Sequence, residues 1–432
     1  MRLQLTRFKE SELAAGFIAT LLGSGASKVI FVAVNFVCSN LLAKEQFGEL
    51  AFIRNTLDMI LCICALNYAG ICTKFTVEAR EDRTSFLKLF WVFLFTLTLC
   101  VIMGLILVVT PSETLQIALN NQTIVSFFRI AGVMLPLFIL QPLIEGVLRG
   151  LKKFKLIGIV QTTTSVFYLI AIYIGIKLDG LRGAVISVML YYSVYSLVCV
   201  VVVSKFVPLC NVINKLSGFW NERSVVGKMI LPIFVMSFVD APVYWINQVL
   251  LSKYGGMVSV GSMVAIMQVA NLAILLPNYF VNTFTTFVGE MNAKKQYEAY
   301  FRRFAILGKS FIWIGIAASI IICLFSKPIL FLYGKDFVED WPAMIFASFS
   351  IPIIMLLSLF KIDLLLQEHQ QELLFIVIGW NATWLAMLYL LLKYSVIPLY
   401  AFFISRALGC VVYLLGVYFV YQRDKNRLLP KK

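Results

Sequence analysis

Five charged side chains lie deep inside long apolar stretches of the sequence, and they are its clearest candidates for chemistry. They are Lys28, Arg54, Asp58, Asp240 and Arg406. A charge at the centre of a bilayer costs about 2.5–3.5 kcal/mol on insertion scales, so such residues usually face a cavity or a partner. We therefore interpret these five residues as candidates for a polar path through a membrane.

The cations among these residues indicate the charge of a transported substrate. Lys28 and Arg406 have no acidic residue within one helical turn, which favours a substrate-binding role facing a cavity. Arg54 is a third substrate-binding candidate, but Asp58 stands four residues away on the same helix face, so mutual neutralisation is an equal alternative. Deep cations without local partners point to an anionic substrate.

The two acids have two open interpretations. Asp58 and Asp240 are either counter-ions of the cations or titrating carboxylates that couple transport to protons. Asp240 lies between Pro232 and Pro242, which predict a broken or kinked helix there.

Amide side chains within or at the edge of the apolar stretches give weaker evidence. Sugar hydroxyls would suit them, but hydrogen bonds between helices explain most of them equally well. They are Asn35, Asn67, Gln141, Gln161, Asn247, Gln248, Gln268, Asn271, Asn278 and Asn381.

The composition identifies the class of protein that must position these residues. Of 432 residues, 61% are hydrophobic and 14% are charged, which excludes an ordinary water-soluble enzyme. The net charge of +15 is explained by basic cytoplasmic loops beside anionic lipids rather than by nucleic acid. No phosphate-binding loop is present, and the single His369 has no companion ligand, so we expect neither a cofactor nor a metal.

Apolar runs long enough to cross a bilayer predict an all-α, polytopic membrane protein with twelve spans. The spans lie near 13–42, 48–70, 87–110, 124–148, 157–177, 181–204, 229–252, 257–281, 305–326, 341–366, 372–393 and 396–421. The N-terminal segment, the loops after even-numbered spans and the C-terminal tail together hold 25 of the 37 Lys and Arg residues, which predicts cytoplasmic N- and C-termini.

The spans divide into two predicted lobes of six helices, as in a duplicated transporter. The N-terminal lobe covers 1–204, the C-terminal lobe 229–421, a cytoplasmic linker 205–228 and a basic tail 422–432. No predicted external loop is long enough to form a folded domain.

Two short motifs resemble those of the polysaccharide transport family of lipid-linked oligosaccharide flippases. Residues 41–50, LLAKEQFGEL, look like the family's exit from the first span, and residues 148–154, LRGLKKF, look like its loop after span 4. Pro232 and Pro277 also fall where family members commonly carry prolines. The family belongs to the multidrug/oligosaccharidyl-lipid/polysaccharide exporter (MOP) superfamily, which also holds the multidrug and toxin extrusion (MATE) exporters.

This resemblance implies a MATE-like fold and an O-antigen flippase of the bacterial inner membrane. Its substrate would be an undecaprenyl-pyrophosphate-linked oligosaccharide, moved by alternating access from the cytoplasmic to the periplasmic leaflet. An O-antigen polymerase and a chain-length regulator are the implied protein partners. Two alternatives are a multidrug exporter of the same superfamily and a membrane enzyme such as an O-antigen polymerase, which resembles this chain less because it carries a large external loop.

Overall fold

The computed structural model consists of helices joined by short turns. It describes residues 23, 25–64, 68–79, 83–110, 122–206, 219–224, 226–293, 296–367 and 369–428. Side chains are described for these residues except at 83–86, 122–126, 228–229, 231–238, 240, 276–293, 362, 365–366 and 370. The Asp240 side chain and most of the predicted linker, 207–218, therefore lie outside the described residues.

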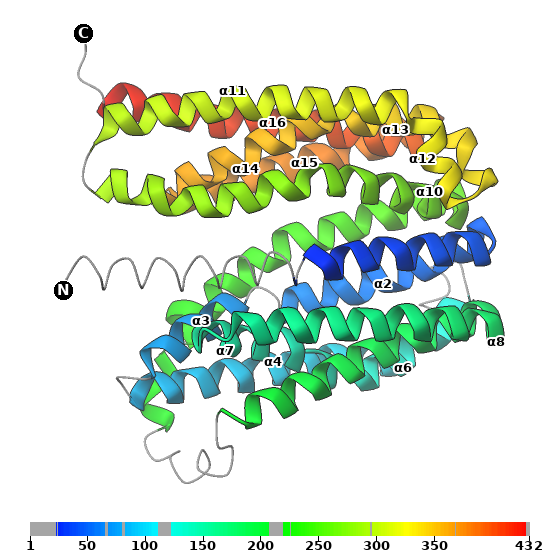
Figure 1. The fold of residues 1–432 in the computed structure, drawn as a ribbon, viewed down its shortest axis with the longest axis horizontal. Coiled ribbons are helices and arrows are strands. Elements are labelled where there is room, and N and C mark those ends of the chain that lie inside the picture. Colours follow the sequence, from blue (N-terminus) through cyan, green and yellow to red (C-terminus); the bar gives the residue numbers. More distant parts are fainter. Residues whose placement is uncertain are drawn as a thin grey trace. The chain divides into compact units, whose positions relative to one another are not determined.

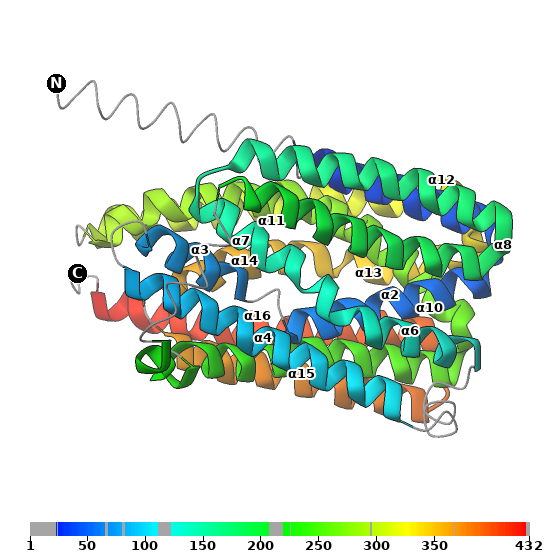
Figure 2. The ribbon, with the colours of Figure 1, turned by 90° about the horizontal axis from the view of Figure 1, so that it is seen from below.

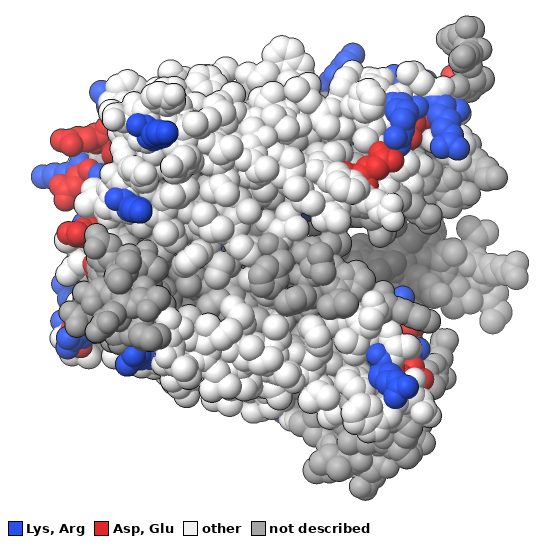
Figure 3. Space-filling model, turned by 180° about the vertical axis from the view of Figure 1, so that it is seen from behind, with Lys and Arg blue, Asp and Glu red and all other residues white. Residues whose placement is uncertain are grey.

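Nine helical segments of the described chain are long and apolar enough to cross a membrane, and the helix Gly25–Leu41 is shorter but also apolar. Helices suit hydrocarbon because every backbone N–H and C=O can be paired within the segment. On the face drawn in Figure 3, charged side chains gather toward the two sides of the view, and the described surface between them is largely uncharged. The all-α, multi-pass architecture is confirmed, while the number of twelve spans stays a prediction.

The chain forms two compact units. The first unit holds Met1–Ala43 and Glu49–Ala241, and the second holds Lys44–Gly48 and Pro242–Lys432. Their boundary thus falls within one continuous helical segment, whereas the sequence analysis places the lobes on either side of 205–228.

The first unit is a bundle of packed helices (Figure 1). Helix α4 packs on α6, α3 packs on α7, and both α6 and α7 pack on α8. The elements are α2 (Lys44–Cys64), α3 (Ala69–Glu78), α4 (Arg83–Val109), α6 (Gln122–Phe138), α7 (Leu140–Gly150), α8 (Phe154–Ser204), η2 (Phe219–Arg223) and η3 (Val226–Ile230).

Helix α8 is a helical hairpin rather than one rod. Asp179 and Gly180 leave helical backbone angles, and Gly180 has a φ of 53°, which glycine adopts without strain. The Ser187 hydroxyl donates to the Ala171 carbonyl at 2.9 Å, so the two arms run back along each other. Gly175 and Gly183 bring the backbones into direct contact. The arms correspond to the fifth and sixth predicted spans.

In the second unit, α11, α14, α15 and α16 lie side by side (Figures 1 and 2). Its elements are α10 (Leu231–Ala293), which begins in the first unit, α11 (Tyr297–Leu324), α12 (Ser326–Tyr333), η4 (Lys335–Asp340), α13 (Trp341–Ser348), α14 (Ser350–Leu366), α15 (Gln370–Lys393) and α16 (Pro398–Leu428). Within α10 only Gly256 leaves helical angles, with a φ of 68°. The helical backbone therefore continues through Pro242 without the predicted break, while the alternative of a kink stays a prediction.

One predicted span of each unit is divided into two helices close to a proline. Helices α6 and α7 meet at Ile139, three residues before Pro142, and α13 and α14 meet at Phe349, three residues before Pro352. A proline cannot donate to the carbonyl four residues earlier. In the second unit that carbonyl belongs to Ser348, and the Ser319 hydroxyl donates to it instead, at 2.8 Å.

The start of α2 is anchored within the second unit. Lys44 forms an ion pair of 2.6 Å with Asp340 and donates to the Asp336 carbonyl at 2.9 Å. Phe47 packs edge-on against Phe337. Gly48 lies against the Met257 backbone so closely that a side chain would not fit.

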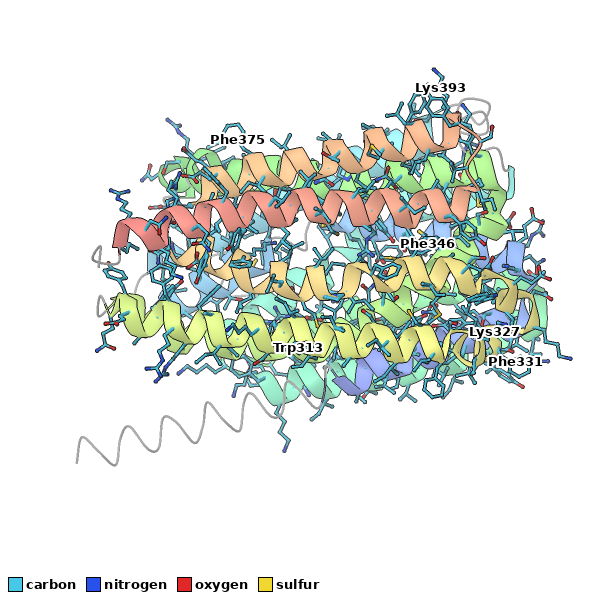
Figure 4. All side chains as sticks on the ribbon, turned by 90° about the horizontal axis from the view of Figure 1, so that it is seen from above. Trp313, Lys327, Phe331, Phe346, Phe375 and Lys393 are labelled. Atoms are coloured by element: carbon cyan, nitrogen blue, oxygen red, sulfur yellow. The ribbon has the colours of Figure 1, made fainter. Side chains whose placement is uncertain are left out.

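Figure 4 shows how the second unit presents its outer residues. Trp313 on α11 and Phe375 on α15 project outward, with exposed fractions of 71% and 72%. Such exposed apolar rings are expected where helices face lipid tails. Lys327 and Lys393 lie at the same end of the unit, as expected for two loops predicted on the same side of the membrane.

The α8 hairpin predicts that Gly183→Ala will destabilise the protein. The new methyl group meets the Gly175 backbone, and overpacking of this kind typically costs about 1–3 kcal/mol. Gly379→Ala is the matched control, since nothing lies within 4 Å of the added atom. The melting temperature of the purified protein in detergent should fall for the first variant only, and equal values would contradict the hairpin packing.

Candidate functional site

The helix Gly25–Leu41 packs tightly on the first arm of α8. Gly23 meets the Gly158 backbone, and the Ser27 and Ser165 hydroxyls lie 2.6 Å apart. Small residues allow membrane helices to approach this closely, as the run of glycine, alanine and serine around Lys28 predicts.

One face of this helix carries Lys28, Phe31 and Asn35, which are spaced three and four residues apart. The Phe31 ring lies 5.6 Å from the Tyr168 ring and 5.5 Å from the Tyr191 ring, so this face is directed toward α8. Lys28 stands one turn before Phe31, and its side chain is exposed.

Arg54 on α2 binds an amide rather than its neighbouring acid. Its Nη1 atom donates to Asn35 Oδ1 at 2.6 Å, and Asn35 is only 4% exposed. No ion pair within 4 Å joins Arg54 to Asp58 among the described side chains, although the two charges attract each other at longer range. The mutual neutralisation considered for this pair is therefore partial, because Arg54 takes a neutral partner.

Asp58 is held by a tyrosine. The Tyr192 hydroxyl on the second arm of α8 donates to Asp58 Oδ1 at 2.6 Å, and the Asp58 side chain remains exposed. A carboxylate with one donor can still accept further hydrogen bonds. Asp58 is therefore equipped to meet a polar ligand or a proton.

An aromatic wall surrounds this polar cluster. Tyr168 and Tyr191 have ring centroids 4.6 Å apart, and Tyr192 lies 5.3 Å from Tyr191 and 5.2 Å from Phe138. Sequence reasoning missed these tyrosines, because 36 Phe, 18 Tyr and 7 Trp residues give no reason to single out a few. The adjacent pair Tyr191-Tyr192, three residues before Tyr195, is the signal that was available.

A second acid, Glu145 on α7, contacts Tyr195, whose ring lies 5.7 Å from that of Tyr191. The Tyr195 hydroxyl donates to it, and Gln141 Nε2, Gln161 Nε2 and Arg149 Nη2 lie 2.8, 3.2 and 3.3 Å from its carboxylate oxygens. Glu145 is only 6% exposed. Because donors from both α7 and α8 surround it, it crosslinks these helices, and the Arg149 contact is an ion pair between residues four apart on α7.

The remaining predicted site residues lie elsewhere. Arg406 is on α16 in the second unit, partly buried, and its Nη1 atom is buried with no hydrogen-bond partner among the described residues. Asp240 lies in α10, and its side chain is outside the described residues. The structure thus brings Arg54 and Asp58 together with the helix that carries Lys28, while a substrate-binding role for Lys28, Arg54 and Arg406 stays a prediction.

The apolar helices and their two-unit arrangement define a polytopic helical membrane protein. No known family model and no curated protein matches its sequence. Solved structures do match it. An inward-facing multidrug resistance MATE family transporter of the MOP superfamily matches with a TM-score of 0.76 and 13% identity, covering 95% of this chain and 98% of that one.

Two further structures agree with this match. An outward-facing MATE family transporter of the MOP superfamily gives a TM-score of 0.64 at 14% identity, covering 97% of this chain and 96% of that one. A MOP superfamily transporter from Pyrococcus furiosus gives 0.60 at 14% identity over the same shares. The chain therefore has the MATE-like fold of MOP superfamily transporters, as predicted.

The Tyr192–Asp58 hydrogen bond predicts coupled effects of mutation. Tyr192→Phe and Asp58→Asn should each lower the melting temperature, and the double variant should lower it by less than their sum. Hydrogen bonds between membrane helices give coupling energies of about 0.6 kcal/mol on average and up to about 1.7 kcal/mol.

Tyr191→Phe is the matched control for that cycle, because the structure gives the Tyr191 hydroxyl no hydrogen bond within the described chain. It should show no coupling to Asp58→Asn. Additive effects of Tyr192→Phe and Asp58→Asn would count against the bond.

Proposed function

We propose that the protein is a flippase for undecaprenyl-pyrophosphate-linked oligosaccharides in the bacterial inner membrane. The observation that supports this most is the state of Arg54, whose guanidinium binds the neutral amide of Asn35 beside the helix face that carries Lys28. A guanidinium held by an amide keeps its positive charge available for a phosphate.

The chemistry of the substrate requires a site of this kind. A hydrated sugar-pyrophosphate cannot enter hydrocarbon without losing its hydrogen bonds to water, whereas the polyprenyl tail can remain in lipid. A flippase therefore supplies cations for the pyrophosphate and polar or aromatic groups for the sugar. Arg54, Lys28 and the tyrosines of the first unit are of these types.

The fold alone does not decide the charge of the substrate. Matching structures include multidrug resistance transporters, and the transporter from Pyrococcus furiosus is described as having a binding pocket of reverse polarity that suggests a different function. In this chain the deep cations Lys28, Arg54 and Arg406 outnumber the deep acids Asp58 and Asp240. This balance supports an anionic substrate.

A multidrug exporter is the second candidate, and Asp58 is the observation that favours it. An exposed carboxylate beside tyrosine rings would also suit an organic cation, through charge and cation–π attraction.

Reconstitution in liposomes tests the two candidates directly. Undecaprenyl-pyrophosphate oligosaccharide is placed in the membrane, and a sugar-modifying enzyme added to one side reports the head groups that reach that side. Protein-dependent exposure of the sugar supports the flippase. Absence of exposure by a folded protein, together with uptake of a cationic dye, would replace it with a drug exporter.

The charges of the first unit predict how variants behave in that assay. Arg54→Gln should slow exposure of the sugar about 10- to 100-fold, since a hydrogen bond to a charged group contributes about 1.5–3 kcal/mol. Lys28→Ala should also slow it, and Lys28→Arg should retain more activity than Lys28→Ala. Lys393→Ala removes an exposed cation at a helix end and serves as the control. Full activity of both Arg54→Gln and Lys28→Ala would exclude the proposed role of these cations.

A further inference from the structure

Three helices of the second unit bring a cluster of aromatic rings together around Trp384. Trp380 and Trp384 on α15 stack with centroids 5.1 Å apart. Tyr244 on α10 lies 6.0 Å from Trp384, and Phe402 on α16 lies 5.6 Å from it on another side. Helices α10, α15 and α16 thus each contribute at least one ring to this cluster.

Arg406 belongs to the face of α16 that meets the two tryptophans. Phe402, Arg406 and Gly409 are spaced four and three residues apart, so they share one helix face. Phe402 contacts Trp384, and a methyl group at Gly409 would lie 2.9 Å from Trp380 Cε3 and 3.2 Å from Trp384 Cβ. The Arg406 side chain therefore leaves α16 between Phe402 and Gly409, which both contact the tryptophans.

Asn247 and Gln248 lie one turn beyond Tyr244 on α10, and both are fully buried. Neither amide has a hydrogen-bond partner among the described residues, at either the oxygen or the nitrogen. Within the described part of the chain, the hydrogen bonds between helices that would explain such amides are therefore not made. Leaving buried polar groups unpaired costs free energy, so a native protein is expected to satisfy them in another state.

Unpaired polar atoms concentrate in this part of the described chain. Six of the eleven buried side-chain atoms without a partner belong to Asn247, Gln248, Trp384 and Arg406. Together they supply donors from an indole, a guanidinium and two amides, and acceptors from two amide oxygens. A ligand that pairs with them must offer both donors and acceptors and an apolar face for the rings.

The geometry points to a sugar-binding subsite formed by Trp380, Trp384, Asn247, Gln248 and Arg406, which would hold one sugar ring of the transported head group. A pyranose has an apolar face whose C–H groups pack against the negative face of an aromatic ring, and hydroxyls that donate and accept. This inference rests on the proposed flippase function and names the part of the substrate that the second unit recognises.

The composition of the cluster distinguishes a sugar from an organic cation. Aromatic rings alone would suit a quaternary ammonium ion, but Arg406 would repel it. The guanidinium instead suits a hydroxyl or a carboxylate of an acidic sugar. Because Asn247 and Gln248 are fully buried in this structure, sugar binding requires a conformation that uncovers them.

The test compares two ligands of the purified full-length protein, undecaprenyl pyrophosphate carrying N-acetylglucosamine and undecaprenyl pyrophosphate without a sugar. Affinities come from the rise in melting temperature on titration. Wild-type protein should bind the sugar-bearing lipid more tightly. Trp384→Leu and Gln248→Leu should each weaken that binding about tenfold, which corresponds to one lost hydrogen bond or stacking contact, and leave binding of the sugar-free lipid unchanged. Trp313→Leu, on the outer face of α11, is the control.

A second measurement separates binding from simple packing. Asn247→Leu replaces an unpaired buried amide by an apolar side chain of similar volume, so the ligand-free variant should melt at a higher temperature while its preference for the sugar-bearing lipid falls. A residue with only a structural role would lower the melting temperature and leave the preference intact.

Each other outcome has a definite meaning. Equal binding of both lipids by the wild type, or a preference that survives Trp384→Leu and Gln248→Leu, would overturn the subsite and leave the flippase standing. Binding of neither lipid would overturn both. Tight binding of tetraphenylphosphonium that Trp384→Leu abolishes would assign the cluster to organic cations instead.

Discussion

Hydrocarbon offers no hydrogen-bond partner, and this constraint decides how the polar groups of the chain are arranged. Hydroxyl side chains inside the spans donate back to their own helices, as Thr56 does to the Phe52 carbonyl and Thr96 to the Val92 carbonyl. Acids collect donors from neighbouring helices, as Glu145 does on α7. A buried polar group without a partner is informative, because no water is available in the hydrocarbon to form the missing hydrogen bond.

Both units place a buried acid beside a tyrosine on a neighbouring helix. In the first unit the Tyr195 hydroxyl donates to Glu145, and in the second the Tyr300 hydroxyl donates to Asp363. Both acids stand near the ends of their spans that are predicted to be cytoplasmic. Asp58 also accepts a hydrogen bond from a tyrosine, but its side chain is exposed, whereas Glu145 and Asp363 are buried. Some polar groups inside the helices thus join neighbouring helices, while others have no hydrogen-bond partner within the described part of the chain.

The sequence predicts the fold well, because a helix is the structure that satisfies its own backbone in lipid, so long apolar runs leave little choice. It also places Arg54 and Asp58 on one face of a helix. It does not predict their partners Asn35 and Tyr192, since these depend on how separate helices pack. The same limit applies to Asn247 and Gln248, which the sequence presents among ten similar amides. Only the packed structure shows which of these amides lack a partner.

The two proline interruptions have a mechanical consequence. At Ile139 and Phe349 the backbone keeps helical angles, yet Pro142 and Pro352 each leave a rung of the ladder unmade. A rod with a missing rung has a lower bending stiffness at that level than above or below it. The Ser319 hydroxyl tethers the freed Ser348 carbonyl without the directional rigidity of a backbone bond. Each unit therefore contains a point at which a span can bend without breaking a backbone hydrogen bond.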